Sequence, residues 1–341
     1  MKHKFLTKRI LTILSVGIMA FSLVSCGKSA EQNKSENSTV KIRVGYFGTS
    51  QYQTQLAIAK EKGYFDEAFK DMNVEVEYNF FAGAGPAINE AALSGEIDVA
   101  FGVGDQPTLS GISNGNENII VSRIVKNARG TGILVGYNSD INSIEKLKGK
   151  KVAVGVGTAN QKTLDLLLED VGLTEEDVEV VNLSKIDEQL AAISSNKIDA
   201  AFTANLSYGI KKAEGNKIAR LLTDCESHPN YAYLSINKKF IDNNTDIVQK
   251  FIDALYKADK WYAENQEEGM KIVSKFLNID FETVKQGNES CDIQMIFNDE
   301  DIDNLKVTYD FMEKNNLLQN KIENLSAIIN DSFIKKSISN N

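Results

Sequence analysis

The chain has 341 residues, of which 38 are basic and 47 are acidic, so its formal net charge at pH 7 is −9. An acidic chain is a poor candidate for nucleic-acid binding, which depends on Lys and Arg side chains that contact phosphates. The chain has only two histidines, and no Gly-rich segment ends in Gly-Lys-Ser/Thr. One of the two histidines, His3, lies in the extreme N-terminal segment, and His228 stands alone before Pro229. The sequence therefore argues against His-based catalytic triads, paired-His zinc sites and a Walker-type phosphate site. We expect no metal, no cofactor and no nucleic-acid partner.

Residues 1–26 have the pattern of a bacterial lipoprotein signal peptide. Basic residues precede an apolar run from Ile10 to Val24, which is shorter than the roughly 20 residues of a membrane-spanning helix. The run ends in Leu-Val-Ser-Cys-Gly, and cleavage there would leave Cys26 as a lipidated N-terminus. An ordinary secretory signal with an incidental cysteine is the alternative. Residues 27–39 are small and polar, so we expect a flexible tether between anchor and domain.

The following part of the chain repeats one pattern of strands and helices. In each half a strand, a Gly-Thr turn, a helix, a second strand, another helix and an Ile-Asp-x-Ala-Phe strand follow one another. The paired segments are 41–47 with 151–156, 74–78 with 178–181, and 91–101 with 191–202. Alternation of short β-rich runs with helical segments predicts an α/β protein of two lobes, each a mainly parallel sheet flanked by helices. A chance likeness between two unrelated α/β domains is the alternative.

The C-terminal part of the chain has helical spacing of its apolar residues. This spacing predicts a helical tail that packs on the first lobe, with helices over 247–263, 268–276, 299–311 and 322–334. Cys225 and Cys291 follow the signal segment, and either a disulfide or two buried small apolar groups would explain them.

Candidate ligand-binding residues follow the predicted strands. In open α/β sheets ligands bind at the carboxyl ends of strands, beside helix N-termini whose free N–H groups and dipole favour anions. Arg129 could bind an anionic group in a bidentate manner, and Tyr52, Phe81 and Tyr208 could stack on a heteroaromatic ring. At each of these corners, where a predicted strand ends and a helix begins, an ordinary turn without a ligand is the alternative. The predicted ligand-binding set is Thr49, Ser50, Gln51, Tyr52, Gly83, Gly85, Asp105, Gln106, Arg129, Thr158, Ala159, Asn160, Asn205 and Tyr208.

Several strings resemble a known family, namely AKEKGYF (59–65), EAALSGEIDVAF (90–101), VGDQPTL (103–109), LKGKKVAVGVGT (147–158) and GLTEEDVE (172–179). The chain resembles the substrate-binding proteins of the nitrate, sulfonate and taurine ABC importers, a group related to thiamine-pyrimidine-precursor proteins. The resemblance implies a two-lobed periplasmic-binding-protein fold of type II with a helical C-terminal tail. It places crossovers near 131–137 and 231–236. Lobe I would then comprise residues 40–130 and 236–341, and lobe II residues 131–235.

One segment departs from the family pattern. Many relatives carry Trp-Asp-Pro just after the Ile-Asp strand of lobe II, whereas this chain reads Phe-Thr-Ala-Asn-Leu at 202–206. The ligand therefore cannot simply be carried over from relatives.

The function that we expect is solute binding without catalysis. The chain would be a monomer, lipid-anchored on the extracytoplasmic face of the cell membrane. It would close on a small anionic or heteroaromatic solute and deliver it to an ABC permease. Two alternatives stay open. One is an enzyme on this fold, as among thiamine-pyrimidine and menaquinone-pathway relatives, and the other is a lipoprotein sensor for a membrane receptor.

Overall fold

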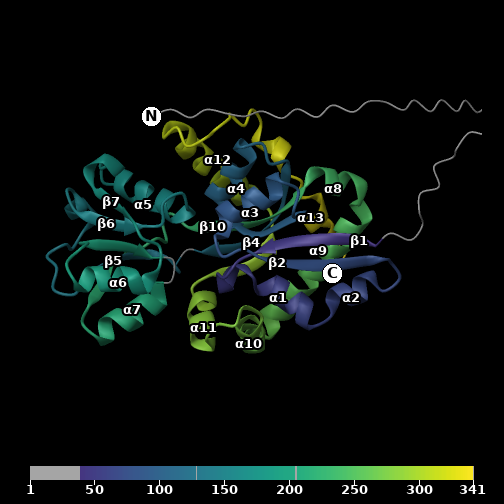
Figure 1. Ribbon diagram of the computed structural model, residues 1–341, viewed down its shortest axis with the longest axis horizontal. Helices are drawn as coiled ribbons and strands as arrows, with labels where there is room; N and C mark the ends of the chain where they lie inside the picture. The colour runs from purple at the N-terminus through teal and green to yellow at the C-terminus, as the bar shows by residue number, and fades with distance from the viewer. Residues whose placement is uncertain (1–38, 128, 204–205, 341) are drawn as a thin grey trace, which may run out of the picture. The chain divides into compact units, whose positions relative to one another are not determined.

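Two β-sheets organise the described part of the chain, which covers residues 39–127, 129–203 and 206–340 of a computed structural model (Figure 1). The predicted signal peptide, most of the predicted tether, the lipidation residue Cys26 and the candidate Asn205 lie outside these residues, as does the side chain of Tyr208. Residues from Thr39 onward form one compact unit. No helix in the described ranges is both long enough and apolar enough to span a membrane.

The first sheet has six strands in the order β11-β4-β10-β3-β1-β2. Strand β1 pairs in parallel with β2 and β3, whereas β10 runs antiparallel to β3 and β4, and β11 runs antiparallel to β4. The strand bounds are β1 (Val40–Tyr46), β2 (Val74–Phe80), β3 (Val99–Gly104), β4 (Asn118–Asn127), β10 (Asn230–Asn237) and β11 (Asp292–Ile296).

The second sheet has five strands in the order β7-β6-β8-β5-β9. Strand β6 is parallel to β7 and β8, and β5 is antiparallel to β8 and β9. The strand bounds are β5 (Gly132–Gly136), β6 (Lys151–Val154), β7 (Glu179–Asn182), β8 (Ala200–Thr203) and β9 (Ala219–Asp224). We call the first sheet with its helices the first lobe, and the second sheet with its helices the second lobe.

The predicted α/β class is confirmed, but both sheets are mixed rather than mainly parallel. The parallel pairs are those of the repeated βα pattern, since crossover helices join them. The antiparallel pairs arise where the chain leaves one sheet and returns to it. The segments predicted as crossovers largely coincide with strands β5 and β10, and the chain passes between the sheets after Asn127 and after Asp224.

Helices cover the faces of both sheets. Helix bounds are α1 (Thr54–Glu61), α2 (Tyr64–Phe69), α3 (Ala84–Leu93), α4 (Asp105–Ser113), α5 (Ala159–Glu169), α6 (Ile186–Ser194), α7 (Leu206–Gly215), α8 (Lys238–Asn243), α9 (Thr245–Glu264), α10 (Gln266–Leu277), α11 (Phe281–Glu289), α12 (Asp299–Lys314) and α13 (Ser332–Ser339). Short 3₁₀ turns are η1 (Ser50–Tyr52), η2 (Ile144–Leu147), η3 (Glu175–Asp177) and η4 (Leu325–Ile328).

In the tail, α9, α10 and α12 confirm three predicted helices, whereas the continuous helix predicted over 322–334 is wrong. There the chain forms η4 and then extends at Ile329, which bridges to Ile120 of β4. The backbone N–H of Asn330 donates to the Ile120 carbonyl at 2.8 Å, so this segment satisfies its backbone on the sheet before α13 begins.

Side chains alternate between the two faces of the second sheet, as a pleated strand requires. Val152 and Val154 belong to the core beneath α5, whereas Ala153 between them belongs to the core beneath α6 and α7. Figure 1 shows α5 on one face of this sheet and α6 and α7 on the other. Burial of a large aliphatic side chain contributes about 1.5–3 kcal/mol, so these layers hold α5 firmly in place.

The two cysteines belong to different lobes. Cys225 is buried in the core of the second lobe, and the partly buried Cys291 packs against the core of the first. Within the described ranges neither forms a disulfide. Both therefore act as small apolar groups, the second of the two alternatives that the sequence left open.

Candidate functional site

The predicted corners lie where strands end and helices begin. In the first lobe, η1 follows β1, α3 follows β2 and α4 follows β3, while in the second lobe α5 follows β6 and α7 follows β8. Helix α5 begins with a side-chain cap, because Thr158 Oγ1 accepts a hydrogen bond from the Asn160 N–H at 3.3 Å. Each corner thus places the start of a helix or 3₁₀ turn at the carboxyl end of a strand.

The corners of α4 and α5 meet although they belong to different lobes. A Cβ atom built on Gly104 would lie 3.4 Å from the Cβ of Ala159. One turn into α5, the Lys162 ammonium donates to the Asp105 carboxylate at the start of α4. The structure therefore brings together the predicted residues Asp105, Gln106, Ala159 and Asn160 at a junction of the two lobes.

Asp105 is fully engaged by protein donors. Its Oδ2 atom accepts from Lys162 Nζ, from Asn304 Nδ2 at 3.1 Å and from Thr308 Oγ1 at 3.2 Å, while its Oδ1 accepts from the Gln106 N–H at 2.7 Å. Asp105 is completely buried and Lys162 is 1% exposed. The sequence pointed to Asp105 as a ligand contact, but these bonds give it a second role between the lobes.

Lys162 was not among the residues predicted from the sequence, although its position carries a physical signal. A cation in the first turn of a helix is unfavourable, because it faces the positive end of the helix dipole. Lys162 is the fourth residue of α5, so its presence there indicates an acidic partner from elsewhere in the chain.

Tyr52 lies at the end of η1 as a neutral hydrogen-bonding group. Burial raises the pKa of its phenol, and nearby Asp105 adds to the rise. Asn127 Nδ2 donates to the Tyr52 hydroxyl at 3.5 Å, and the ring packs edge-on against Phe47 with centroids 6.1 Å apart. The phenol can therefore donate a hydrogen bond at neutral pH without becoming charged.

Ser50 and Gln51 are covered by α11, a helix that the sequence did not predict. A Cβ on Gly287 of α11 would lie 2.8 Å from Gln51 Oε1 and 3.1 Å from Ser50 Oγ. Both side chains are buried, and Ser50 Oγ donates to Gln51 Oε1 at 3.2 Å. The C-terminal tail thus takes part in the first corner of the site.

The other predicted residues occupy varied positions. Gly85 packs on the α4 corner, since a Cβ there would lie 2.8 Å from the Pro107 Cβ, whereas Gly83 is exposed. Asn160 Oδ1 accepts from Asn230 Nδ2 at 3.1 Å, which ties α5 to the start of β10. Thr49 is partly exposed ahead of η1, and Arg129 is exposed after β4.

Two buried amides next to these corners lack hydrogen-bond partners within the described residues. They are Gln53, with both amide atoms unpaired, and Gln106, with its Oε1 unpaired. Gln53 is 0% exposed, and its Nε2 lies 3.0 Å from the position of a Cβ on Gly102. Unpaired buried polar atoms are uncommon and mark places where water or a ligand completes the bonding. Gln53 directly follows the predicted corner 49–52, so extending that corner by one residue would have found it.

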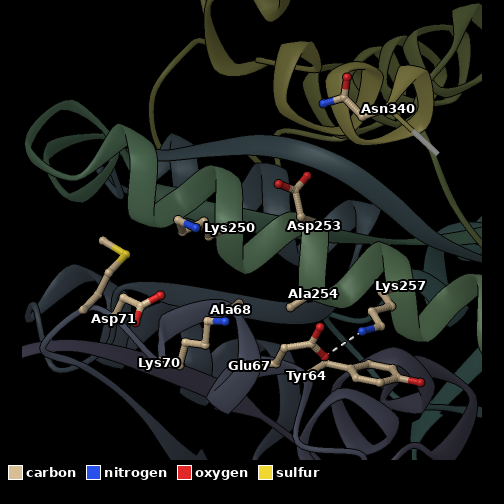
Figure 2. Close-up of a pocket in the computed structure, with 11 residues that line it drawn as sticks. Tyr64, Glu67, Ala68, Lys70, Asp71, Lys250, Asp253, Ala254, Lys257 and Asn340 are labelled. Carbon is tan, nitrogen blue, oxygen red and sulfur yellow. Dashed lines mark hydrogen bonds and ion pairs between the residues drawn. The ribbon is translucent and has the colours of Figure 1, made fainter.

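A different pocket of about 400 Å³ lies between α2 and α9, away from the predicted residues (Figure 2). Its lining carries charges of both signs, and one ion pair joins Lys257 to Glu67 at 2.7 Å, drawn as a dashed line in Figure 2. Both of these side chains are largely exposed. Such a surface hollow lacks the convergence of helix N-termini that the corners provide.

Two mixed β-sheets flanked by helices, with strand-end corners that meet between the lobes, define the class of periplasmic-binding-protein folds. A C-terminal helical tail packs on the first lobe. Within this class the chain belongs to the NMT1/THI5-like family, whose sequence model matches residues 50–269. A relative from Bacillus subtilis (strain 168), described as an aliphatic sulfonates-binding protein, is 26% identical over 321 residues, covering 93% of this chain and 94% of the relative.

Solved structures share the fold. The alkanesulfonate-binding protein SsuA from Xanthomonas axonopodis pv. citri, bound to MOPS, has a TM-score of 0.71 at 21% identity, covering 85% of this chain and 98% of that one. The desulfurization enzyme DSZB has a TM-score of 0.68 at 17% identity, covering 88% and 99% of the two chains. The fold thus serves both binding proteins and an enzyme.

Proposed function

We propose that the chain is the solute-binding lipoprotein of an ABC importer, and that it binds a small anionic solute of the sulfonate class between its lobes. The observation that carries the proposal is the meeting of the α4 and α5 corners across the two lobes, with Gly104 and Ala159 in contact. Relatives described as sulfonate-binding proteins support the ligand class.

The chemistry of the corners suits such a solute. A sulfonate is a strong acceptor with a delocalised charge, so N–H groups at helix N-termini, the Tyr52 phenol and the Gln53 and Gln106 amides could bind it without a buried cation. Lys162 is already paired with Asp105 and Arg123 with Asp301, so recognition by neutral donors fits the bonds that the structure shows.

A thermal-shift screen tests the proposal. The purified chain is melted with alkanesulfonates, taurine, MOPS, nitrate, sulfate and pyrimidines, and a true ligand at 100 times its Kd should stabilise the protein by about 2.7 kcal/mol. The solute is then recovered and examined by NMR. A ligand-dependent rise with unchanged solute supports a binding protein, turnover of the solute supports an enzyme, and no shift with any solute overturns the proposal.

A pair of variants locates the binding. Ala159→Trp places a large side chain where the α4 and α5 corners meet and should abolish the ligand-dependent shift. The matched control is Glu188→Trp, in the exposed first turn of α6, which should keep the shift. Equal shifts in both variants would place the ligand elsewhere.

The anchor and the partner are tested separately. Incorporation of labelled palmitate into the chain, lost in Cys26→Ser, would support lipidation. Co-purification with a permease would support transport, whereas co-purification with a receptor kinase would support the sensor alternative.

A further inference from the structure

A buried ion pair joins the two lobes beside the proposed site. Lys162 of α5 belongs to the second lobe and Asp105 of α4 to the first, and the two side chains are 1% and 0% exposed. Removing two charges from water is costly, and only close pairing with further hydrogen bonds compensates for it. The pair is therefore stable only while these two surfaces stay in contact.

The first lobe supplies the additional hydrogen bonds from α12. Thr308 Oγ1 donates to Asp105 Oδ2 at 3.2 Å and accepts from Lys162 Nζ at 3.3 Å. Asn304 Nδ2 donates to Asp105 Oδ2 at 3.1 Å and to the Tyr233 hydroxyl at 3.2 Å. Three elements of the first lobe, namely α4, α12 and β10, thus form the socket that receives Lys162.

The second lobe presents Lys162 on a turn that is itself fixed. Thr163 Oγ1 donates to Asn230 Oδ1 at 2.7 Å, and Asn160 accepts from Asn230 Nδ2 at 3.1 Å. Asn230 is the first residue of β10, the strand by which the chain returns to the first sheet. The start of α5 is therefore held at the return crossing on one side and at the Asp105 socket on the other.

We propose that Asp105 and Lys162 form an interlobe lock whose stability sets the fraction of molecules in which the α4 and α5 corners meet. Separation of the lobes at this contact would require both charges to be hydrated or left unpaired. Given the proposed function, apparent solute affinity rises with the fraction of molecules already in the binding-competent arrangement. Asp105 and Lys162 would then be positioning residues that tune affinity without contacting the solute.

The chain offers a matched control for this lock. Lys314 of α12 and Glu169 of α5 also pair across the lobes, with 2.7 Å between Nζ and Oε1. Their side chains are 64% and 33% exposed, and exposed pairs contribute little because water solvates both charges. Comparison of the two pairs separates a buried lock from ordinary surface attraction.

The test measures interlobe distance without any solute. Spin labels are placed on the full chain at Asp66→Cys in α2 and Glu176→Cys in η3, both exposed, and pulsed electron paramagnetic resonance records the distance distribution in detergent. The labelled chain without these two cysteines gives the background from native thiols. Asp105→Asn, Lys162→Met, their double variant and Glu169→Gln are compared, and circular dichroism establishes that each is folded.

We expect each single variant to lower the ratio of short to long interlobe distances by about tenfold or more, since one buried charge loses its partner. The double variant should recover part of the ratio, because neither charge remains unpaired. Glu169→Gln should leave the distribution unchanged. Should Asp105→Asn fail to fold, Thr308→Val, which removes only the hydroxyl, should give a smaller shift in the same direction.

Folded single variants with an unchanged distance distribution would overturn the lock, because the ion pair would then contribute nothing to the balance between short and long interlobe distances. A shift as large in Glu169→Gln would also overturn it. No solute enters the measurement, so a chain that binds none of the screened solutes would contradict the proposed function and leave the lock standing.

Discussion

Gly104 and Ala159 belong to different lobes, yet a Cβ on the former would be 3.4 Å from the Cβ of the latter. Disulfides form when Cβ atoms are about 3.5–4.5 Å apart, so this contact is close to the required geometry. Gly104 has φ −63° and ψ 161°, which any residue can adopt, so a cysteine there introduces no backbone strain.

We therefore predict that Gly104→Cys with Ala159→Cys forms an interlobe disulfide under mild oxidation. Cross-linked peptides detected by mass spectrometry check the bond, and reduction should restore free thiols. The bond should slow solute exchange, because the two corners can no longer separate. If the cysteines react only with external thiols and never with each other, the corners do not meet in solution.

Gly102 and Gly95 share a left-handed backbone but differ in their surroundings. Their φ angles are +76° and +75°, and a Cβ on Gly102 would lie 2.6 Å from the Tyr52 carbonyl, whereas a Cβ on Gly95 meets nothing within 4 Å. We expect Gly95→Ala to lower the free energy of unfolding by about 1 kcal/mol through backbone strain alone. Gly102→Ala should cost about 2–4 kcal/mol, because β3 and η1 must also move apart.

Denaturant titration measures the difference between these variants. The solute-dependent thermal shift should fall in Gly102→Ala and persist in Gly95→Ala, since only the former displaces the Tyr52 corner. Equal losses of stability would mean that the close approach of Gly102 to Tyr52 is relaxed in solution.

Asp165 of α5 makes stability depend on pH. Burial, with a contribution from nearby Glu175 and Glu169, raises the pKa of this carboxyl to about 7 from an ordinary value of 3.8. Between these pH values the folded chain retains a proton that the unfolded chain has lost, so stability falls as pH rises from about 4 to 7. Within the described ranges its Oδ1 has no hydrogen-bond partner, which agrees with a neutral, poorly solvated acid.

We predict that Asp165→Asn stabilises the chain by about 1–3 kcal/mol at pH 8 and has little effect at pH 4. Thermal unfolding at several pH values checks this, with the exposed Asp66→Asn as control. A stabilisation by Asp165→Asn that is the same at pH 4 and pH 8 would rule out titration of Asp165 as its source.

The cysteines give a prediction about thiol chemistry. Burial raises the pKa of Cys225 to about 12 and also raises the pKa of Cys291, so both are poor nucleophiles in the folded state. In a Cys26→Ser chain, a thiol reagent at pH 8 should react slowly with the native protein and count two thiols after unfolding without reductant. A count of zero would establish a disulfide.

The repeated half of the fold was predictable because its signals are local. The parallel strands β1 to β3 and β6 to β8 each carry their own apolar run, turn and helix, and these are the elements that the sequence predicted. Strands β4, β9 and β11 were not predicted, since their partners lie far away in the chain and no adjacent turn marks them. The antiparallel pairs of both sheets join these strands or the parallel strands to β10 and β5, and β11 adds a further antiparallel pair with β4.

The candidate site was likewise predictable only in its local part. Corners next to strand ends could be located from the sequence, and the structure brings the α4 and α5 corners together. The residues that contact these corners from far along the chain lie in the C-terminal tail. They are Thr308 and Asn304, which bond to Asp105, and Gly287, which lies against Gln51. Such contacts span some 200 residues and leave no local trace in the sequence.

The strand order also constrains the order in which the two sheets can form during synthesis. Every strand of the second sheet falls within residues 132–224, whereas the first sheet needs β10 and β11, which emerge much later. The second lobe can thus complete its sheet before β10 and β11 are available to pair with β3 and β4 of the first sheet. We expect the segment from Asn230 onward to complete the sheet that begins at Val40, and a chain shortened before Asp292 to lack the edge strand β11 beside β4.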